Sequence, residues 1–148
     1  MSRMRRGTGR AIRLGMVAAL TAVPWRVSWA QTVQPQARVI EILADHDSRY
    51  KIQGQKQPTI TVRAGEQITL RITAKKAKHL NRDGSIHGFA LLRAKDRQPV
   101  PGWDFLLKPG VQEFTVAAPS EAGEYIVVCT VICSEDHEGM SMRFVVLP

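Results

Sequence analysis

The most informative stretch of this chain is Cys129-Thr-Val-Ile-Cys133-Ser-Glu-Asp-His137-Glu-Gly-Met140. It contains both cysteines of the protein, one of its four histidines and one of its five methionines, with the spacing C-x3-C-x3-H-x2-M. Thiolate, imidazole and thioether groups are the soft and borderline ligands that copper prefers. Because packing alone does not require these residue types at this spacing, the stretch predicts a soft metal site.

Two local structures could bring these four side chains together. On a helix, at about 100° per residue, they would share a stripe roughly 80° wide. On a loop that leaves a strand, they could instead wrap around a metal. Residues 125–128 and 130–132 are mostly β-branched or aromatic, as strands prefer, and Gly139 interrupts any helix. We therefore expect a loop.

The rest of the chain has the pattern of an all-β protein. Short alternating segments recur at about the eight- to twelve-residue spacing of a β-sandwich, and no segment has a convincing helical period. We expect strands at 38–43, 50–53, 59–62, 67–73, 86–92, 111–117, 123–130 and 142–147. Residues 59–73 form the clearest unit, two strands around a turn at Gly65, and residues 96–109 are expected to be a long connection. The predicted fold is a Greek-key β-sandwich.

The charge of the chain is concentrated at its N-terminus. The 148 residues carry a formal net charge of +8, but residues 1–30 contain six arginines and no acid. Residues 31–148 therefore hold 15 basic and 13 acidic side chains, a net charge of about +2. This distribution argues against a nucleic-acid partner.

The N-terminal segment has the three parts of an export signal. Arg3 to Arg13 form a basic region, Leu14 to Val23 an apolar region, and Ser28-Trp29-Ala30 a cleavage site of the small-residue type. We expect residues 1–30 to be a signal peptide, 31–36 a short linker and 37–148 one domain. The alternative is an uncleaved anchor, although the apolar run is shorter than the ~20 residues of a membrane span. Export would place the protein in the periplasm or on the outer face of the cytoplasmic membrane, without a transmembrane span in the mature chain.

The cysteine stretch, together with Ile86-His87-Gly88-Phe89, resembles the binuclear copper centre CuA. This centre is found in two cupredoxin-fold domains, one in cytochrome c oxidase subunit II and one at the C-terminus of nitrous oxide reductase. The turn Thr61-Val-Arg-Ala-Gly-Glu66 is also similar to the early hairpin of cupredoxins. The resemblance implies a cupredoxin-like sandwich and a free-standing, soluble relative of subunit II.

The resemblance also implies a ligand set for two copper ions. Two bridging thiolates, one histidine for each copper, a weak thioether and a backbone carbonyl would come from Cys129, Cys133, His87, His137, Met140 and Val131. The chain departs from the oxidases at two positions, since they usually have glutamate where Val131 stands and glycine where Ser134 stands. A carbonyl ligand does not depend on the side chain, so valine is compatible with the role.

The implied function is electron transfer, not catalysis. The sequence contains no HExxH motif, no glycine-rich phosphate loop and no recognisable Ser-His-Asp arrangement. A redox partner such as a c-type cytochrome or a terminal oxidase or reductase is expected. Phe89, Ile132 and Met142 are candidate walls of the site, and His46 and His79 are expected on the surface.

Other interpretations stay open on the sequence alone. The two cysteines could form a structural disulfide, since exported proteins favour such bonds. His87 could be an ordinary buried histidine, and Met140 a core residue. The same ligands could also serve a periplasmic copper carrier or chaperone.

Overall fold

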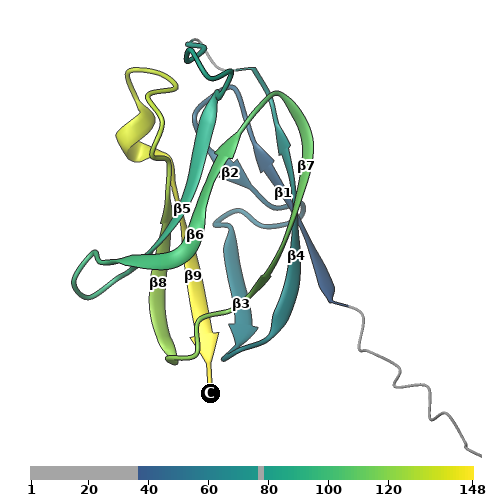
Figure 1. Cartoon of the computed structure of the whole chain (residues 1–148), viewed down its shortest axis with the longest axis vertical. Helices are drawn as coiled ribbons and strands as arrows, with labels where there is room; N and C mark the ends of the chain where they lie inside the picture. The colour runs from purple at the N-terminus through teal and green to yellow at the C-terminus, as the bar shows by residue number, and fades with distance from the viewer. Residues whose placement is uncertain (1–36, 77–78) are drawn as a thin grey trace, which may run out of the picture. The chain divides into compact units, whose positions relative to one another are not determined.

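The computed structural model describes residues 37–76 and 79–148, which form a sandwich of two sheets (Figure 1). The predicted signal peptide and linker lie outside the described residues. Within these ranges there are nine strands and one short 3-10 turn. They are β1 (Arg38–Ala44), β2 (Tyr50–Lys51), β3 (Thr59–Arg63), β4 (Gln67–Ala74), β5 (His87–Arg93), β6 (Pro99–Leu107), β7 (Gly110–Ala117), β8 (Gly123–Val128), η1 (His137–Gly139) and β9 (Ser141–Leu147).

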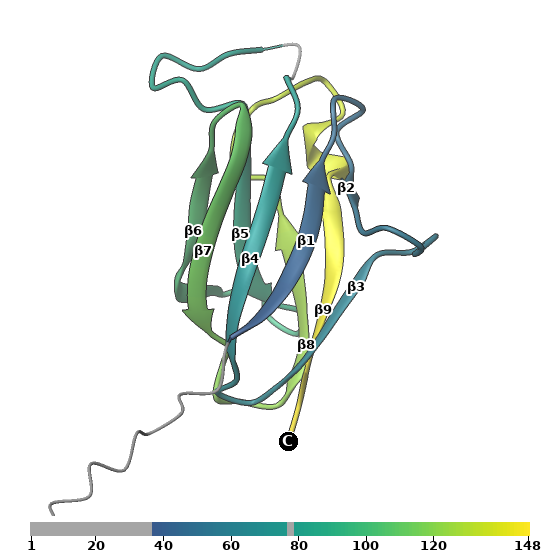
Figure 2. The same cartoon turned by 90° about the vertical axis from the view of Figure 1, so that its right-hand side faces the viewer.

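Strands distant in sequence are paired, as expected for a Greek-key sandwich. One sheet has the order β2-β1-β4-β7 and the other the order β3-β9-β8-β5-β6. Figure 2 shows the two sheets face to face. The all-β, Greek-key sandwich predicted from the alternating pattern is confirmed.

The core lies between the two sheets and is built by alternation. On β4 the side chains of Ile68, Leu70 and Ile72 are fully buried, and the residues between them are partly exposed. On β9 the buried side chains include Phe144 and Val146. Because successive side chains of a strand point to opposite faces, this period places one apolar face of each sheet against the other.

The segment expected to be a connection, 96–109, contains strand β6 instead. Pro99 and Pro101 argue against a central strand because proline cannot donate a ladder hydrogen bond. β6 is the edge strand of its sheet, where proline is tolerated. The pairing of β5 with β6 is irregular between Ala90 and Leu92. The prediction that this segment is a connection was therefore wrong.

The expected hairpin around Gly65 is also corrected. β3 pairs with β9, whereas β4 pairs with β1 and β7, so the turn joins the two sheets and not two neighbouring strands. Gly65 has φ 71°, a left-handed conformation that glycine adopts without steric cost. Both strands direct their apolar side chains into the same core from opposite sheets, which explains the strong alternation on each side of the turn.

This topology brings the candidate ligands to one end of the sandwich. His87 is the first residue of β5, and Cys129 directly follows β8, which pairs with β5. Met140 immediately precedes β9, which pairs with β8.

In the described ranges, no helix has the length and apolar character needed to cross a membrane.

Candidate metal centre

His87 is held in a single orientation by the backbone. Its side chain is fully buried, and its Nε2 lies 3.2 Å from the Lys75 carbonyl oxygen. Burial lowers the pKa of His87, although the Lys75 carbonyl acts in the opposite direction. The neutral ring therefore donates from Nε2–H and leaves a lone pair on Nδ1. Nδ1 is buried and has no hydrogen-bond partner within the part of the chain that the structure describes.

The two cysteines lie beside this imidazole. Both are free and buried, and their sulfurs are 3.8 Å apart, well beyond the ~2.05 Å of a disulfide. One ligand atom each from His87, Cys129 and Cys133 can be chosen so that all three lie within 4.8 Å of one another. Here we call these three residues the donor cluster. They come from two segments separated by about a quarter of the chain, so the fold assembles the cluster.

Cys129 is further fixed by hydrogen bonds to its sulfur. The Gly88 N–H donates to Cys129 Sγ at 3.3 Å, and the thiol can donate to the Val131 carbonyl at 3.2 Å. Gly88 is required for this approach, because an added Cβ would lie 2.3 Å from Thr130 Oγ1 and 2.7 Å from Thr130 N. Any side chain at position 88 would therefore push the strand away from the cysteine.

The cluster is an unfavourable place for an uncompensated negative charge. Burial raises the pKa of the Cys129 thiol to about 11. Burial also raises the pKa of Tyr50 well above its ordinary range, with the two cysteines contributing in the same direction. The Tyr50 hydroxyl donates to the Gly88 carbonyl. A bound cation is the natural compensation for thiolates in such surroundings.

Met140 lies at the base of the cysteine loop. Its side chain is buried, and its carbonyl accepts a hydrogen bond from the Cys129 N–H at 3.1 Å, which closes the loop at both ends. Phe89 and Met142 are buried as expected for walls, but Ile132 is 64% exposed. The expectation for Ile132 was wrong because Val131 and Cys133 on either side of it face inward.

His137 stands apart from the donor cluster. It lies on η1, its side chain is only partly buried, and its Nδ1 is 3.1 Å from the Ser134 carbonyl oxygen. It is not among the residues whose donor atoms lie within 4.8 Å of one another. The structure thus brings His87, Cys129 and Cys133 together, and places His137 in the adjoining loop. His46 and His79 are exposed, as expected.

Sequence reasoning missed the contribution of the turn between β1 and β2. Ser48 Oγ lies 3.7 Å from Cys133 Sγ and 2.6 Å from Ser134 Oγ. Nearby, the Asp45 carboxylate accepts a hydrogen bond from Lys51 Nζ at 2.7 Å. Nothing in the local sequence marks Ser48, because its contact with Cys133 spans 85 positions.

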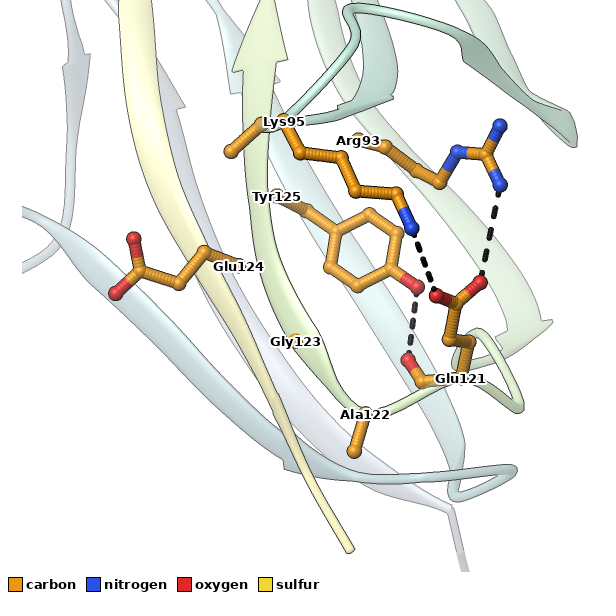
Figure 3. A pocket seen from close by; sticks show the side chains of 8 residues that line it. Arg93, Lys95, Glu121, Ala122, Gly123, Glu124 and Tyr125 are labelled. Atoms are coloured by element: carbon orange, nitrogen blue, oxygen red, sulfur yellow. Dashed lines mark hydrogen bonds and ion pairs between the residues drawn. The ribbon is translucent and has the colours of Figure 1, made fainter.

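A groove at the opposite end of β8 is a different kind of feature (Figure 3). Its charged side chains are already paired, since Glu121 lies 3.2 Å from Lys95 Nζ and 3.7 Å from Arg93 Nη1. The Tyr125 hydroxyl donates to the Glu121 carbonyl at 2.8 Å. These contacts fasten the start of β8. Glu124, the other acidic side chain drawn, pairs with Arg143, so the acidic groups of the groove already have partners.

Comparison with solved structures identifies the fold. The copper protein auracyanin A of Chloroflexus aurantiacus matches 74% of this chain and 98% of its own, with 21% identity and a TM-score of 0.52. Rusticyanin of Thiobacillus ferrooxidans matches 77% of this chain and 79% of its own, with 18% identity and a TM-score of 0.53. A chain of a heme-copper terminal oxidase dimer matches 76% of this chain and 66% of its own, with 16% identity and a TM-score of 0.51.

These likenesses show that the chain has the cupredoxin fold. No family model and no curated protein sequence matches it.

Proposed function

We propose that this chain is an exported copper-binding electron-transfer protein with a CuA-like binuclear site. The proposed ligands are the side chains of His87, Cys129, Cys133, His137 and Met140 and the carbonyl of Val131. One observation carries the proposal: a buried imidazole nitrogen that has no partner among the described residues belongs to the same cluster as two free, buried thiols.

The donor set favours copper over harder metals. Thiolate, imidazole and thioether ligands select soft and borderline ions, whereas magnesium and calcium take oxygen ligands. The second cysteine is the distinctive element, because single-copper blue sites use one cysteine with two histidines and a weak thioether. Auracyanin A, described as a "blue" copper protein, and the heme-copper oxidase both share this fold, which supports copper.

The surroundings of the cluster suit electron transfer. Bound copper would supply a one-electron couple, and the chain's own residues would hold it in a fixed, water-poor setting. The Lys75 carbonyl orients His87, and the Gly88 N–H holds Cys129. Because these contacts come from the backbone of the sandwich, the ligands need little rearrangement when charge changes. A c-type cytochrome or a terminal oxidase or reductase would be the redox partner, outside the cytoplasm.

In a binuclear site His137 would serve the second copper, so it need not belong to the donor cluster. Its ring lies on η1, which has only three residues and no buried one. An adjustment of this ring toward a bound copper would therefore disturb no core packing.

The direct test is copper loading of the purified, reduced protein. Metal analysis and native mass spectrometry are expected to give two copper ions per chain, and voltammetry a reversible one-electron couple. A limit of one copper per chain would contradict the binuclear site. Failure to take up copper after reduction of both thiols would contradict the metal site as a whole.

The partly exposed position of His137 favours a second candidate, a periplasmic copper carrier. A three-donor cluster with a partly exposed fourth ligand on a short turn would load and release copper readily. In that case a competing chelator would remove copper within the mixing time, and voltammetry would show no reversible couple. Retention of copper against the chelator would favour electron transfer.

A further inference from the structure

The two cysteine sulfurs of the donor cluster have different hydrogen-bond partners. Cys129 Sγ accepts from the Gly88 backbone N–H, a donor present in any residue except proline. Cys133 Sγ instead lies 3.7 Å from the side-chain hydroxyl of Ser48. The partner of Cys133 is therefore set by the amino-acid type at position 48.

Ser48 has an unusual backbone conformation for a residue other than glycine. Its φ is 57°, and its side chain is buried although Asp47 and Arg49 on either side are exposed. Left-handed turn positions ordinarily favour glycine, asparagine or aspartate. Turn geometry alone thus gives little reason for a serine here, whereas its hydroxyl has a specific use.

The turn that carries Ser48 is held in place from both sides. The Ser48 N–H donates to the Asp45 carbonyl at 3.2 Å, and the Asp45 N–H donates to the Arg49 carbonyl at 3.0 Å. The Asp45 carboxylate also pairs with Lys51 Nζ at 2.7 Å. These contacts fix the Ser48 hydroxyl against the cysteine loop.

The neighbouring hydrogen bonds allow the Ser48 hydroxyl to donate to the sulfur. The Asp136 N–H can only donate, and it does so to Ser134 Oγ at 3.1 Å. The Ser134 hydroxyl can then donate to Ser48 Oγ at 2.6 Å, which leaves the Ser48 hydrogen for Cys133 Sγ. A metal-bound thiolate has no proton and can only accept. In this arrangement the chain of donors ends on the sulfur, and each bond polarises the next.

We propose that Ser48 is a positioning residue that donates a hydrogen bond to the Cys133 sulfur and thereby raises the reduction potential of the copper centre. This inference rests on the proposed function. A donor at a ligand sulfur withdraws electron density and stabilises the reduced, more electron-rich state. The β1–β2 turn would thus adjust the centre from outside its ligand set.

The test compares Ser48→Ala with Ser48→Gly in the copper-loaded protein. Both variants lack the hydroxyl, but only glycine adopts φ 57° without strain. We expect both to keep the wild-type copper stoichiometry and to lower the reduction potential equally. The expected size is about tenfold in the one-electron equilibrium, or ~59 mV. The sulfur-to-copper absorption band is expected to shift in both variants.

Two further variants locate the effect. Ser134→Ala removes the preceding donor and is expected to give a smaller shift in the same direction. Ser120→Ala, at an exposed turn before the start of β8 and thus at the opposite end of that strand from Cys129, is expected to leave potential and absorption unchanged.

The outcomes separate this inference from the proposed function. A wild-type potential and absorption band in copper-loaded Ser48→Gly would overturn the role of Ser48 but would leave the proposed function standing. A shift in Ser48→Ala without one in Ser48→Gly would assign the effect to backbone strain and would also overturn it. A wild-type protein that takes up no copper would overturn the proposed function, and this inference with it.

Discussion

The candidate centre has two halves that differ in how the fold supports them. His87 and Cys129 lie at the ends of two paired strands. The Lys75 carbonyl accepts from His87 Nε2 and so orients the free Nδ1, and the Gly88 N–H donates to Cys129 Sγ. His137 instead lies on a single 3-10 turn without a buried residue. The first half is prearranged by the sheet, whereas the second depends on a loop. Preorganised ligands bind without an ordering cost, so the strand-held half should dominate metal affinity.

Replacement of Cys129 by serine is expected to have the largest effect. It removes the sulfur that the sheet fixes most firmly and, with it, one of two possible thiolate bridges. Copper content should fall from two ions per chain to at most one, and the sulfur-to-copper absorption should change. Metal analysis and visible absorption measure both. A variant with the parent spectrum would show that the ligand assignment is wrong.

The two histidines provide the sharpest test of the comparison. His87→Ala is expected to weaken copper binding by at least about 100-fold, and His137→Ala by roughly tenfold, because only His87 is preorganised. Competition titration against a chelator of known affinity measures both.

The exposed histidines supply matched controls. His46→Ala and His79→Ala should keep the wild-type affinity. If His87→Ala kept the copper stoichiometry and spectrum, His79 would become the candidate ligand. A larger loss in His137→Ala than in His87→Ala would reverse the assignment of the two halves.

Two glycines distinguish the halves without removing a ligand. Gly88→Ala should lower the free energy of unfolding by about 1–3 kcal/mol, because its Cβ would meet the Thr130 backbone nitrogen at 2.7 Å. Gly139→Ala on η1 should have almost no effect, since its Cβ would meet no atom of the described residues within 4 Å. Denaturant unfolding of the metal-free protein measures both. Equal losses would show that the loop is packed as tightly as the strands.

The smallest effect is expected at the turn that supports Cys133. The hydrogen bond from Lys51, opposed by burial, holds the pKa of Asp45 well below its usual range. Asp45→Asn should therefore cost about 1 kcal/mol near neutral pH. Because the folded pKa lies below the unfolded value of about 4, this stabilisation is present above pH ~4 and is lost as pH falls below it.

Unfolding curves across this pH range provide the check. Wild type and Asp45→Asn should differ in stability at pH 7 and converge in acid. A difference that stayed constant down to pH ~2 would show that the carboxylate charge is not responsible.

The sequence predicted most of the fold because the sandwich depends on local alternation. Strands such as β4 and β9 follow directly from their buried residues, Ile68 and Phe144 among them. β6 was missed because its prolines argue against a strand unless its edge position is known. The pairing partners of β3 and β4 could not be predicted either. β3 pairs with β9 and β4 with β1 and β7, and the local alternation of a strand does not say which strand lies beside it.

For the site, the sequence pointed to the three residues of the donor cluster but not to the groups that support them. The cysteine spacing pointed to the loop, and His87 was found through a resemblance to a family. Ser48 and Tyr50 had no sequence signal, since they contact Cys133 and Gly88 only through the folded chain. The exposure of Ile132 depends on which way a loop residue faces, and no period fixes that direction.

Electron paramagnetic resonance of the copper-loaded protein tests the central claim most directly. If Cys129 and Cys133 held two copper ions that share one electron equally, the spectrum would have a seven-line hyperfine pattern, which is the expected result. A four-line pattern would place the electron on one copper and contradict the binuclear centre.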